Sequence, residues 1–534
     1  MSFLSIRGVR AAVRGAVCAA LFLIPATASA EWYEASTKHF VLYANDDPKF
    51  IERYTAALER FDLAMRKFRN VEDREIAPVD RVTIYMLPGI NSMADLGRDG
   101  AAGFYIPRAG GSVAFTIKEG SKPNPGSRTR VDERFELNPT QVLRHEYGHH
   151  FMFNNFSAAA LPMWLTEGFA EFHATAEDLP DGSVRFGRIP LYRAANFEFT
   201  DACSVGLVLR TSDLRKLGGC QVSHIYAYGW LATHYFTFAP GGPKLIGDYI
   251  TAVNRGEPLE KAVAAFGNVD ALAGEMQRYL NAKSRTVFAV PAASLNTAAP
   301  VMRKLSPAEA ATMSVRIRSK AGVSENEAPK VYEAAVRAAA PYPNDPAAQL
   351  VLAEAAYDAK KYAEAAAAAQ RVVDANPKST KGLVYLGLAK LELARAAKTT
   401  DVKVWREARS WLVSANKADP YDAEPLLHYY RSFLAAGERP TKNAEEGLLQ
   451  ASEFVPHDRT LLFDVAYVML GRNDPKAARS ALQVIAYNPH GTGKSVANKL
   501  IDMIDKNDLA GAMAKLQPYL ADPNYRDPED KRRG

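Results

Sequence analysis

The chain is poor in cysteine and carries no strong excess of charge of either sign. Its 534 residues include three cysteines, and the formal net charge is +6. Half of that charge comes from Arg7, Arg10 and Arg14, which stand in a stretch of 30 residues without acidic side chains. The rest of the sequence has no stripe of lysine and arginine of the kind that neutralises phosphates. We therefore expect no nucleic-acid partner.

Long apolar runs are also lacking. The one candidate, residues 15–24, is shorter than the roughly 20 residues that a membrane-spanning helix needs. Arginines precede it, and Pro25 and the small residues Ala28-Ser29-Ala30 follow it. This order predicts a signal peptide over residues 1–30, cut after Ala30, with no membrane span in the mature chain. We expect a periplasmic or secreted protein.

Export determines how the few cysteines are interpreted. Cys18 lies inside the predicted signal peptide, so Cys203 and Cys220 are left as an even pair in an oxidising compartment. A disulfide closing this short loop is one hypothesis. Two unrelated buried cysteines are the alternative.

From Glu31 onward, strand patterns come before helical ones. Strands are predicted in three segments, 40–43, 80–87 and 111–117. Asn138 and Pro139 suit the N-cap and the first position of a helix, and helical patterns continue beyond it. Residues 31–295 are thus predicted to form an α+β domain. Residues 296–342, rich in Ala, Ser and Pro where they begin, are predicted to be a linker or helical connection.

Residues 343–520 are repetitive. Alanine-rich helical stretches end near prolines at intervals of 43, 36 and 33 residues, at Pro377, Pro420, Pro456 and Pro489. The segment "LAEAAYDAKKYAEAAAAAQRVVDANP" alternates small and large residues and resembles the tetratricopeptide family, whose period is about 34 residues. The resemblance implies an all-α solenoid whose concave surface recruits a protein partner or the substrate. An irregular Ala-rich bundle is the alternative. The charged residues 521–534 are expected to be disordered.

The stretch "VLRHEYGHHFMF" gathers three of the ten histidines of the chain. On a helix, His145 and His149 lie four positions apart on one face, so both imidazoles can reach one ion. Two imidazoles supply half of a tetrahedral Zn²⁺ shell, although another divalent ion suits the same donors. Glu146 is offset by about 100° around the helix axis, beside the ion, where it can act as a general base.

A catalytic zinc site needs a third protein ligand. The segment "WLTEGFAEF" offers Glu167, after 17 residues that leave room for a turn and a return helix. H-E-x-x-H followed by W-L-x-E-G-x-A resembles the gluzincin metallopeptidases, which include thermolysin-like enzymes and the membrane-alanyl aminopeptidase group. The resemblance implies a thermolysin-like zincin domain over residues 31–295, with Glu167 as the third ligand of one Zn²⁺ and a peptide or protein as substrate.

The same resemblance assigns two further residues. Glu171 stands where the clan often has an acidic residue that orients a ligand histidine, because a ligating imidazole needs an acceptor for its other N–H. Tyr226, with Gly229 three residues later, matches the Y-x-x-G segment whose tyrosine contacts the oxyanion. The alternative is that Tyr226 is a core or interfacial aromatic. Tyr228, His224 and His234 are weaker candidates for that task, and His150 points away from the ligand face as a structural or surface histidine.

Some family features are absent. No G-x-M-E-N segment is present, so cleavage within a chain is at least as well supported as aminopeptidase activity. The strand at 111–117 precedes the zinc helix, as the edge strand does in this clan, and an extended peptide could pair with it. A catalytically inactive periplasmic scaffold that binds through the repeats is the alternative from another functional class, and intact Glu146 argues against it.

Overall fold

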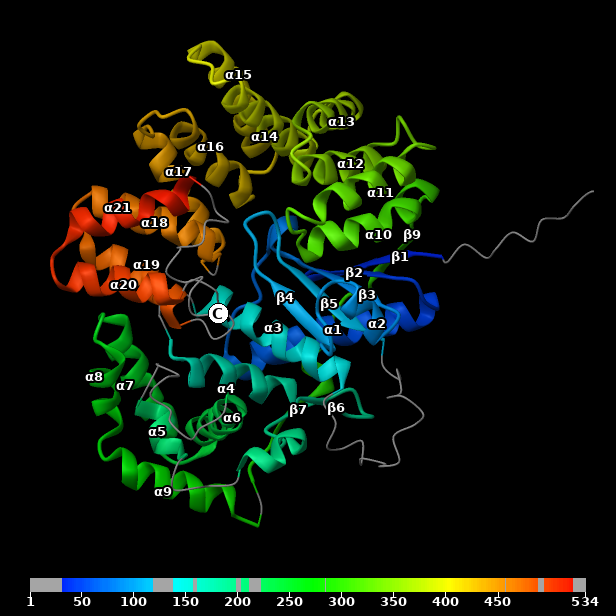
Figure 1. Cartoon of the computed structure of the whole chain (residues 1–534). Helices are drawn as coiled ribbons and strands as arrows, with labels where there is room; N and C mark the ends of the chain where they lie inside the picture. Colours follow the sequence, from blue (N-terminus) through cyan, green and yellow to red (C-terminus); the bar gives the residue numbers. More distant parts are fainter. Residues whose placement is uncertain are drawn as a thin grey trace, which may run out of the picture.

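The computed structural model describes residues 31–118, 138–156, 161–197, 203–210, 222–283, 285–456, 458–487 and 494–521. The predicted signal peptide, Cys220 and the tail after residue 521 lie outside these ranges. Figure 1 shows an N-terminal sheet and its helices, around which a long array of helical hairpins curves. Within the described ranges, no helix has the length and apolar character that crossing a membrane requires.

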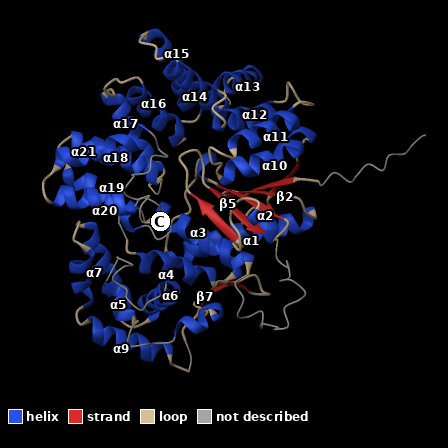
Figure 2. Ribbon diagram, in the orientation of Figure 1, coloured by secondary structure: helices blue, strands red, loops and turns tan. Residues whose placement is uncertain are grey.

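The larger sheet of the described chain has the spatial order β4-β5-β3-β2-β1-β9. Its central strands β2, β3 and β5 are parallel, whereas β1, β9 and β4 pair antiparallel to their neighbours. The bounds are β1 Tyr33–Ser36, β2 Phe40–Ala44, β3 Val82–Leu87, β4 Gly103–Ile106, β5 Val113–Ile117 and β9 Val301–Lys304. All three predicted strands are therefore present in one sheet, coloured red in Figure 2.

The expected place of the strand at 111–117 at the sheet edge is wrong. In the described sheet, β5 lies between β4 and β3, and the two edge strands are β4 and β9. The reason is burial: every residue of β5 is buried, whereas every residue of β4 is only partly buried. A parallel strand covered on both faces has a continuous apolar sequence, as "VAFTI" does.

Helices cover both faces of this sheet. On one face, α1 (Pro48–Arg69) and α3 (Pro139–Asn155) share an apolar cluster with Phe40, Leu42 and Ile84. On the other face, the cluster formed by Tyr85 and Phe115 includes residues of α2 (Ile90–Ala94) and α10 (Pro307–Ala321). Two-sided cover is what a sheet with a parallel centre requires.

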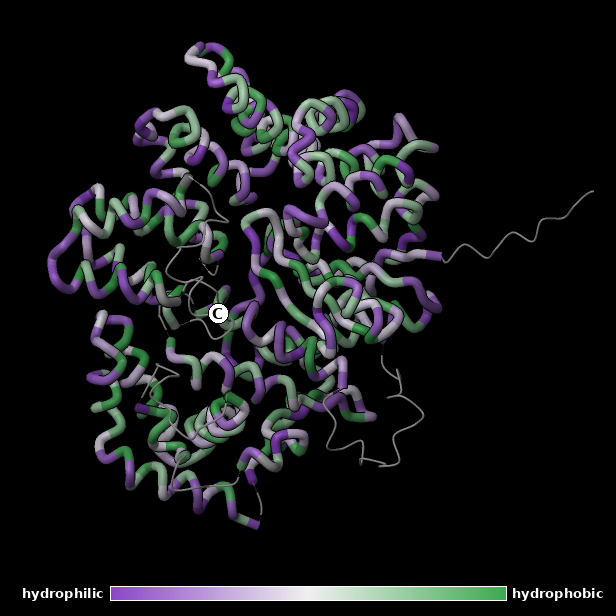
Figure 3. The backbone as a smooth tube through the Cα atoms, viewed as in Figure 1, coloured by the Kyte–Doolittle hydropathy of each residue, from purple (hydrophilic) through white to green (hydrophobic). Residues whose placement is uncertain are grey.

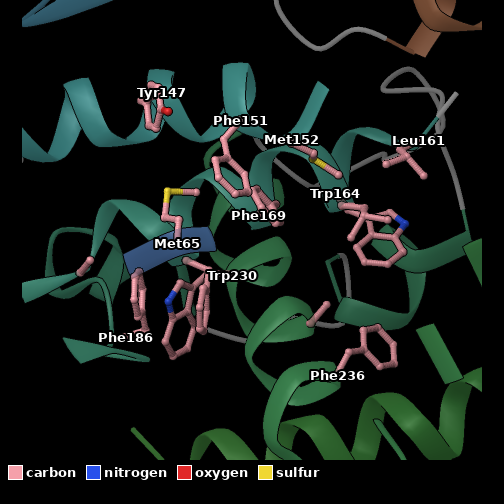
Figure 4. Packing of buried hydrophobic residues seen from close by; sticks show 14 of the residues in the cluster. Met65, Tyr147, Phe151, Met152, Leu161, Trp164, Phe169, Phe186, Trp230 and Phe236 are labelled. Atoms are coloured by element: carbon pink, nitrogen blue, oxygen red, sulfur yellow. The ribbon is translucent and has the colours of Figure 1, made fainter. Parts of the chain in front are cut away.

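A helical region follows α3 and packs beneath it. Its elements are α4 Met163–Ala174, α5 Val205–Arg210, α6 Val222–Phe238, α7 Gly242–Asn254, α8 Leu259–Ala262 and α9 Val269–Leu280, with a small sheet of β6 Glu177–Asp178, β7 Val184–Phe186 and β8 Phe288–Val290. Its core is aromatic. Figure 4 shows Trp164, Phe169, Trp230 and Phe236 packed between these helices.

The segment predicted to be a connection, residues 296–342, is built into the fold. It contains β9, which pairs with β1, and then the hairpin α10 and α11 (Ala328–Ala339). A capping box at Ser306 starts α10. The Ser306 side chain accepts a hydrogen bond from the Glu309 N–H, and the Glu309 side chain accepts one from the Ser306 N–H. Helical hairpins therefore begin at Pro307, within the segment predicted to be a linker or helical connection.

The C-terminal half is an array of helical hairpins, in which consecutive helices pack on one another. Side chains of Asp, Ser or Thr cap many of them, for example Asp345, Ser379 and Asp422. Figure 3 shows hydrophobic and hydrophilic stretches alternating along the helices. The bounds after α11 are α12 Pro346–Asp358, α13 Tyr362–Ala375, α14 Thr380–Ala396, α15 Val402–Ala418, α16 Ala423–Ala435, α17 Lys442–Phe454, α18 Arg459–Gly471, α19 Pro475–Tyr487, α20 Lys494–Asp505 and α21 Leu509–Ala521.

Candidate metal centre

The histidine pair stands on α3, whose start is fixed by its own sequence. The Asn138 side chain accepts a hydrogen bond from the Gln141 N–H, and the Gln141 side chain accepts from the Asn138 N–H. Pro139 occupies the first helical turn. This start leaves His145 and His149 on the same helical face, and both are buried.

Glycines bring the three helices of the site close together. A Cβ on Gly148 of α3 would lie 3.0 Å from the Ala170 Cα of α4. A Cβ on Gly168 of α4 would lie 2.2 Å from the Gly229 oxygen of α6. Because no side chain separates these backbones, α4 can direct Glu167 to the histidines of α3. The Gly in W-L-x-E-G and the Gly in Y-x-x-G thus have a packing role in this chain.

His145, His149 and Glu167 meet at one point. The two Nε2 atoms are 3.2 Å apart, and the Glu167 Oε2 lies 3.2 Å from the His145 Nε2 and 3.6 Å from the His149 Nε2. A tetrahedral ion with bonds of about 2.0–2.1 Å separates its ligand atoms by about 3.3 Å. The donor set and its spacing therefore fit a zinc ion, and Glu167 is fully buried at 0% exposure.

Glu171 holds the far side of the His145 ring. Its Oε1 lies 3.4 Å from the His145 Nδ1 and accepts from the Arg193 Nη2 at 2.8 Å, and its Oε2 accepts from the Tyr192 hydroxyl at 2.8 Å. Burial acts to raise the pKa of Glu171, but its contacts with His145 and Arg193 hold the pKa below its usual value. An ionised Glu171 fixes the ring with its Nε2 toward His149 and Glu167.

Tyr192 and Arg193 were not identified from the sequence. They belong to a 3-10 segment, Leu191–Phe197, that follows the small sheet. No periodicity or motif distinguishes this segment, and only its return to α4 brings the two residues to Glu171. Burial acts to lower the pKa of His145, but Glu167 and Glu171 together raise it to about 10.

Tyr226 lies against the same cluster. Its ring stacks on the His145 ring, with centroids 5.7 Å apart, and the Arg193 guanidinium lies 4.7 Å from the Tyr226 ring centroid. Burial raises the pKa of the Tyr226 phenol, and the charges of Glu167 and Glu146 raise it further. The hydroxyl therefore keeps its proton at neutral pH. Glu146 is half-buried on α3 and lies close enough for its charge to act on this hydroxyl.

The other sequence candidates lie elsewhere. His150 is buried rather than at the surface, with Nδ1 2.9 Å from the Tyr105 hydroxyl and Nε2 2.9 Å from the Asn154 Nδ2. His234 is also buried, and its ring nitrogens face the Gly187 oxygen and the Tyr279 hydroxyl. The geometry thus separates both histidines from the cluster of His145, His149 and Glu167.

Two weaker candidates for the oxyanion task lie on α6. The Tyr228 hydroxyl donates to the Cys203 oxygen at 3.5 Å in the core, so this tyrosine is directed away from the cluster. The half-buried His224 lies with its ring centroid 6.0 Å from that of Tyr228. Tyr226 is thus the tyrosine of this helix that contacts a histidine of the cluster.

A second group of possible metal donors lies behind α3. His39, Asp62 and Asp73 have ligand atoms within 4.8 Å of one another. Arg66 Nε donates to Asp62 Oδ2 at 2.7 Å, so a fixed cation already stands in this group. The Tyr147 hydroxyl of α3 donates to Asp62 Oδ1 at 2.5 Å. The group is thus a charge-compensated network that supports α3 from α1.

The predicted disulfide falls partly outside the described residues. Cys203 is buried and disulfide-bonded. Cys220 lies in the range that the structure does not describe, so the pairing of these two cysteines stays a prediction.

Comparison with models of protein families finds no match for this chain, and comparison with curated proteins finds none either. Among solved structures, the chain is similar to a thermophilic TPR protein of Thermus thermophilus. The alignment covers 39% of this chain and 97% of that chain, with 20% sequence identity and a TM-score of 0.29. A similarity this weak does not indicate the function of this chain.

Proposed function

We propose that the chain is an exported zinc-dependent peptidase of the gluzincin type, with an array of helical hairpins that serves recruitment of a protein partner or the substrate. The observation that supports the proposal most is the convergence of His145 Nε2, His149 Nε2 and Glu167 Oε2 within a few tenths of an ångström of tetrahedral spacing. Export is proposed from residues 1–30.

The three converging side chains would hold Zn²⁺. When bound, the ion supplies Lewis-acid chemistry and lowers the pKa of water. Glu171 keeps the His145 ring in one orientation through its Nδ1, with the help of Tyr192 and Arg193. A ligand held in this way loses little conformational freedom during the reaction, because its rotamer is set in advance.

Glu146 is the proposed general base. It would take a proton from the water that attacks the peptide carbonyl, and then donate that proton to the nitrogen of the leaving amine. The Tyr226 hydroxyl, kept protonated by its raised pKa, would donate a hydrogen bond to the carbonyl oxygen as negative charge develops there. Both the base and the donor would act at the same carbonyl group.

The test compares the wild type with Glu146→Gln on a peptide library made from denatured proteins. Loss of the base should reduce cleavage by about 10²–10⁴-fold while the zinc content is unchanged. Glu52→Gln is a matched control, because Glu52 is an exposed glutamate on α1. A chelator should abolish wild-type cleavage. Equal cleavage by the wild type and Glu146→Gln would overturn the peptidase proposal, and absence of cleavage in both would favour an inactive scaffold.

A further inference from the structure

The turn between β4 and β5, residues 107–111, lies against the helical array. Ala109 in this turn is only 6% exposed and belongs to the same apolar cluster as Ala423, Leu427 and Leu461 of the array. The first helices of successive hairpins, α10, α12, α14, α16 and α18, face this turn across a shared cavity. Part of the surface predicted to receive a partner is therefore occupied by the N-terminal domain of the same chain.

Polar contacts fix the turn on the array. The Ala109 N–H donates to the Asp458 Oδ2 at 3.0 Å, and Asp458 is itself buried. The Arg108 Nη2 donates to the Lys320 oxygen, 2.6 Å away, near the end of α10. These two bonds join the turn to helices that are far apart in the array, so the turn is held from two sides.

Gly110 fits a charged part of the array. A Cβ on Gly110 would lie 2.5 Å from the Glu424 Oε2 and 2.9 Å from the Lys381 Nζ. Lys381 is held by ion pairs with Glu424 at 2.6 Å and Asp422 at 2.9 Å. The position next to Ala109 thus accepts a glycine and leaves no room for a side chain unless this ion pair moves.

The strand that leads into this turn runs beside the helix of the candidate site. At its start, a Cβ on Gly103 would lie 3.0 Å from the Val142 Cγ1 of α3. Further along, the Tyr105 hydroxyl lies 2.9 Å from the His150 Nδ1. Glu146 stands between Val142 and His150 in α3, so β4 passes along the part of the helix that carries the proposed base.

We propose that the helical array positions β4 for an extended peptide substrate, with Asp458 as the positioning residue. This inference rests on the proposed peptidase function. β4 is the edge strand of the described sheet that lies beside α3, and an extended peptide can bind such an edge through main-chain hydrogen bonds. The array holds the end of β4 in register, and thereby sets the distance between the bound peptide and Glu146.

A cavity adjoins this contact. Its volume is about 610 Å³, and Arg108, Ala109, Gly110 and Asp458 line it. The turn therefore has space beside it, and the hydrogen bond from Ala109 to Asp458 limits its displacement. When that bond is lost, the turn keeps the bond from Arg108 to the Lys320 oxygen but loses its polar link to α18.

Asp458→Asn tests the proposal without removing the helix cap. The Asp458 Oδ1 accepts from the Thr460 N–H at 2.9 Å and caps α18, and asparagine keeps this oxygen. Its Nδ2 cannot accept the Ala109 N–H. Asp345→Asn is the matched control, because Asp345 caps α12 through the Ala347 and Ala348 N–H groups.

The full-length zinc-loaded variants are compared on a peptide of ten or more residues and on a dipeptide amide too short to pair with β4. Asp458→Asn should raise KM for the long peptide by roughly three- to tenfold, the effect of one hydrogen bond, with kcat on the dipeptide amide unchanged. Amide hydrogen exchange over residues 103–106 should become faster. Gly110→Ala, which perturbs the other side of the contact, should act in the same direction.

The outcomes separate this inference from the proposed function. If the wild type cleaves the long peptide but Asp458→Asn matches Asp345→Asn in KM and in hydrogen exchange, positioning by the array is wrong and the peptidase proposal stands. If the wild type cleaves neither substrate, the proposed function fails and the inference fails with it. A rise in KM for the long peptide alone, in both Asp458→Asn and Gly110→Ala, supports the inference.

Discussion

Helices approach one another closely in two regions of the molecule, but through different residues. Around the candidate metal centre, Gly148 faces Ala170 and Gly168 faces Gly229, so backbone meets backbone. In the array, alanines such as Ala355, Ala365, Ala368 and Ala389 are fully buried between helices, and Gly387 faces the side chain of Leu412 rather than backbone. Alanine places a single methyl group between neighbouring helices, and this spacing suits a hairpin that is repeated many times. A shell of ligands a few ångströms wide needs the closer approach that glycine allows.

The two regions also treat buried charge differently. In the array, carboxylates pair with fixed cations, as in Lys381 with Glu424 and Arg431 with Asp464 at 2.6 Å each. In the metal centre, Glu167 faces two imidazoles, which can lose their protons and accept an ion instead. These carboxylates of the array are thus paired with cations of the chain itself, whereas the centre has a donor set suited to a metal ion.

Gly168→Ala is expected to have the largest effect, because it changes the closest contact between backbones around the candidate metal centre. The new Cβ would lie 2.2 Å from the Gly229 oxygen, so α4 and α6 must separate. Overpacking of this kind lowers the free energy of unfolding by about 1–3 kcal/mol or more. Because Glu167 is the adjacent residue, zinc content should fall as well. Denaturant unfolding and metal analysis measure the two effects.

The control is Gly247→Ala in α7, where no atom lies within 4 Å of the added Cβ. Alanine inside a helix should raise stability there by about 0.5–1 kcal/mol. If Gly168→Ala and Gly247→Ala have the same free energy of unfolding and the same zinc content, the close approach of the backbones does not set the geometry of the centre.

Tyr226→Phe tests the chemistry of the candidate metal centre separately from its packing. Loss of one donor to the oxyanion should lower kcat by about 10²–10³-fold, while zinc content and melting temperature hold. Tyr228→Phe, two residues along α6, should leave kcat unchanged, because the Tyr228 hydroxyl donates to the Cys203 oxygen in the core. Unaltered turnover in Tyr226→Phe would make Tyr226 a structural aromatic.

Asp358→Asn should have the smallest effect and tests the electrostatics of the array. Burial and, to a smaller extent, the charge of Glu354 raise the pKa of Asp358 from 3.8 to about 7, against the opposing charges of Lys320 and Arg108. The folded state thus binds the proton of Asp358 more tightly than the unfolded state does. The stabilisation that comes from this proton is complete below pH 3.8 and is lost as the pH rises through about 7. Asn should raise the melting temperature at pH 8 by about 2–4 °C and have little effect at pH 4.

Thermal unfolding at the two pH values measures this difference. Asp374→Asn on α13 is the control, since Asp374 is exposed and accepts a hydrogen bond from Gln370. Equal melting temperatures for the wild type and Asp358→Asn at pH 8 would mean that Asp358 has no elevated pKa in the folded array.

Local rules predicted part of the candidate site, and long-range packing decided the rest. The N-cap at Asn138 and the four-residue step between His145 and His149 are properties of one helix, so they could be recognised in the sequence. The partners of Glu171 could not be recognised, because Tyr192 and Arg193 come from an irregular segment. The interior place of β5 and the packing of α10 on the sheet depend on which surfaces are covered.

By itself, the sequence determined the helix that carries His145, Glu146 and His149, because hydrogen bonds and caps within a helix involve neighbouring residues. Only the tertiary structure decided that the turn at 107–111 meets Asp458 and that β4 forms an edge of the described sheet. The contact between Ala109 and Asp458 joins residues more than 300 positions apart, and its burial depends on the packing of many elements at once, which no local pattern records.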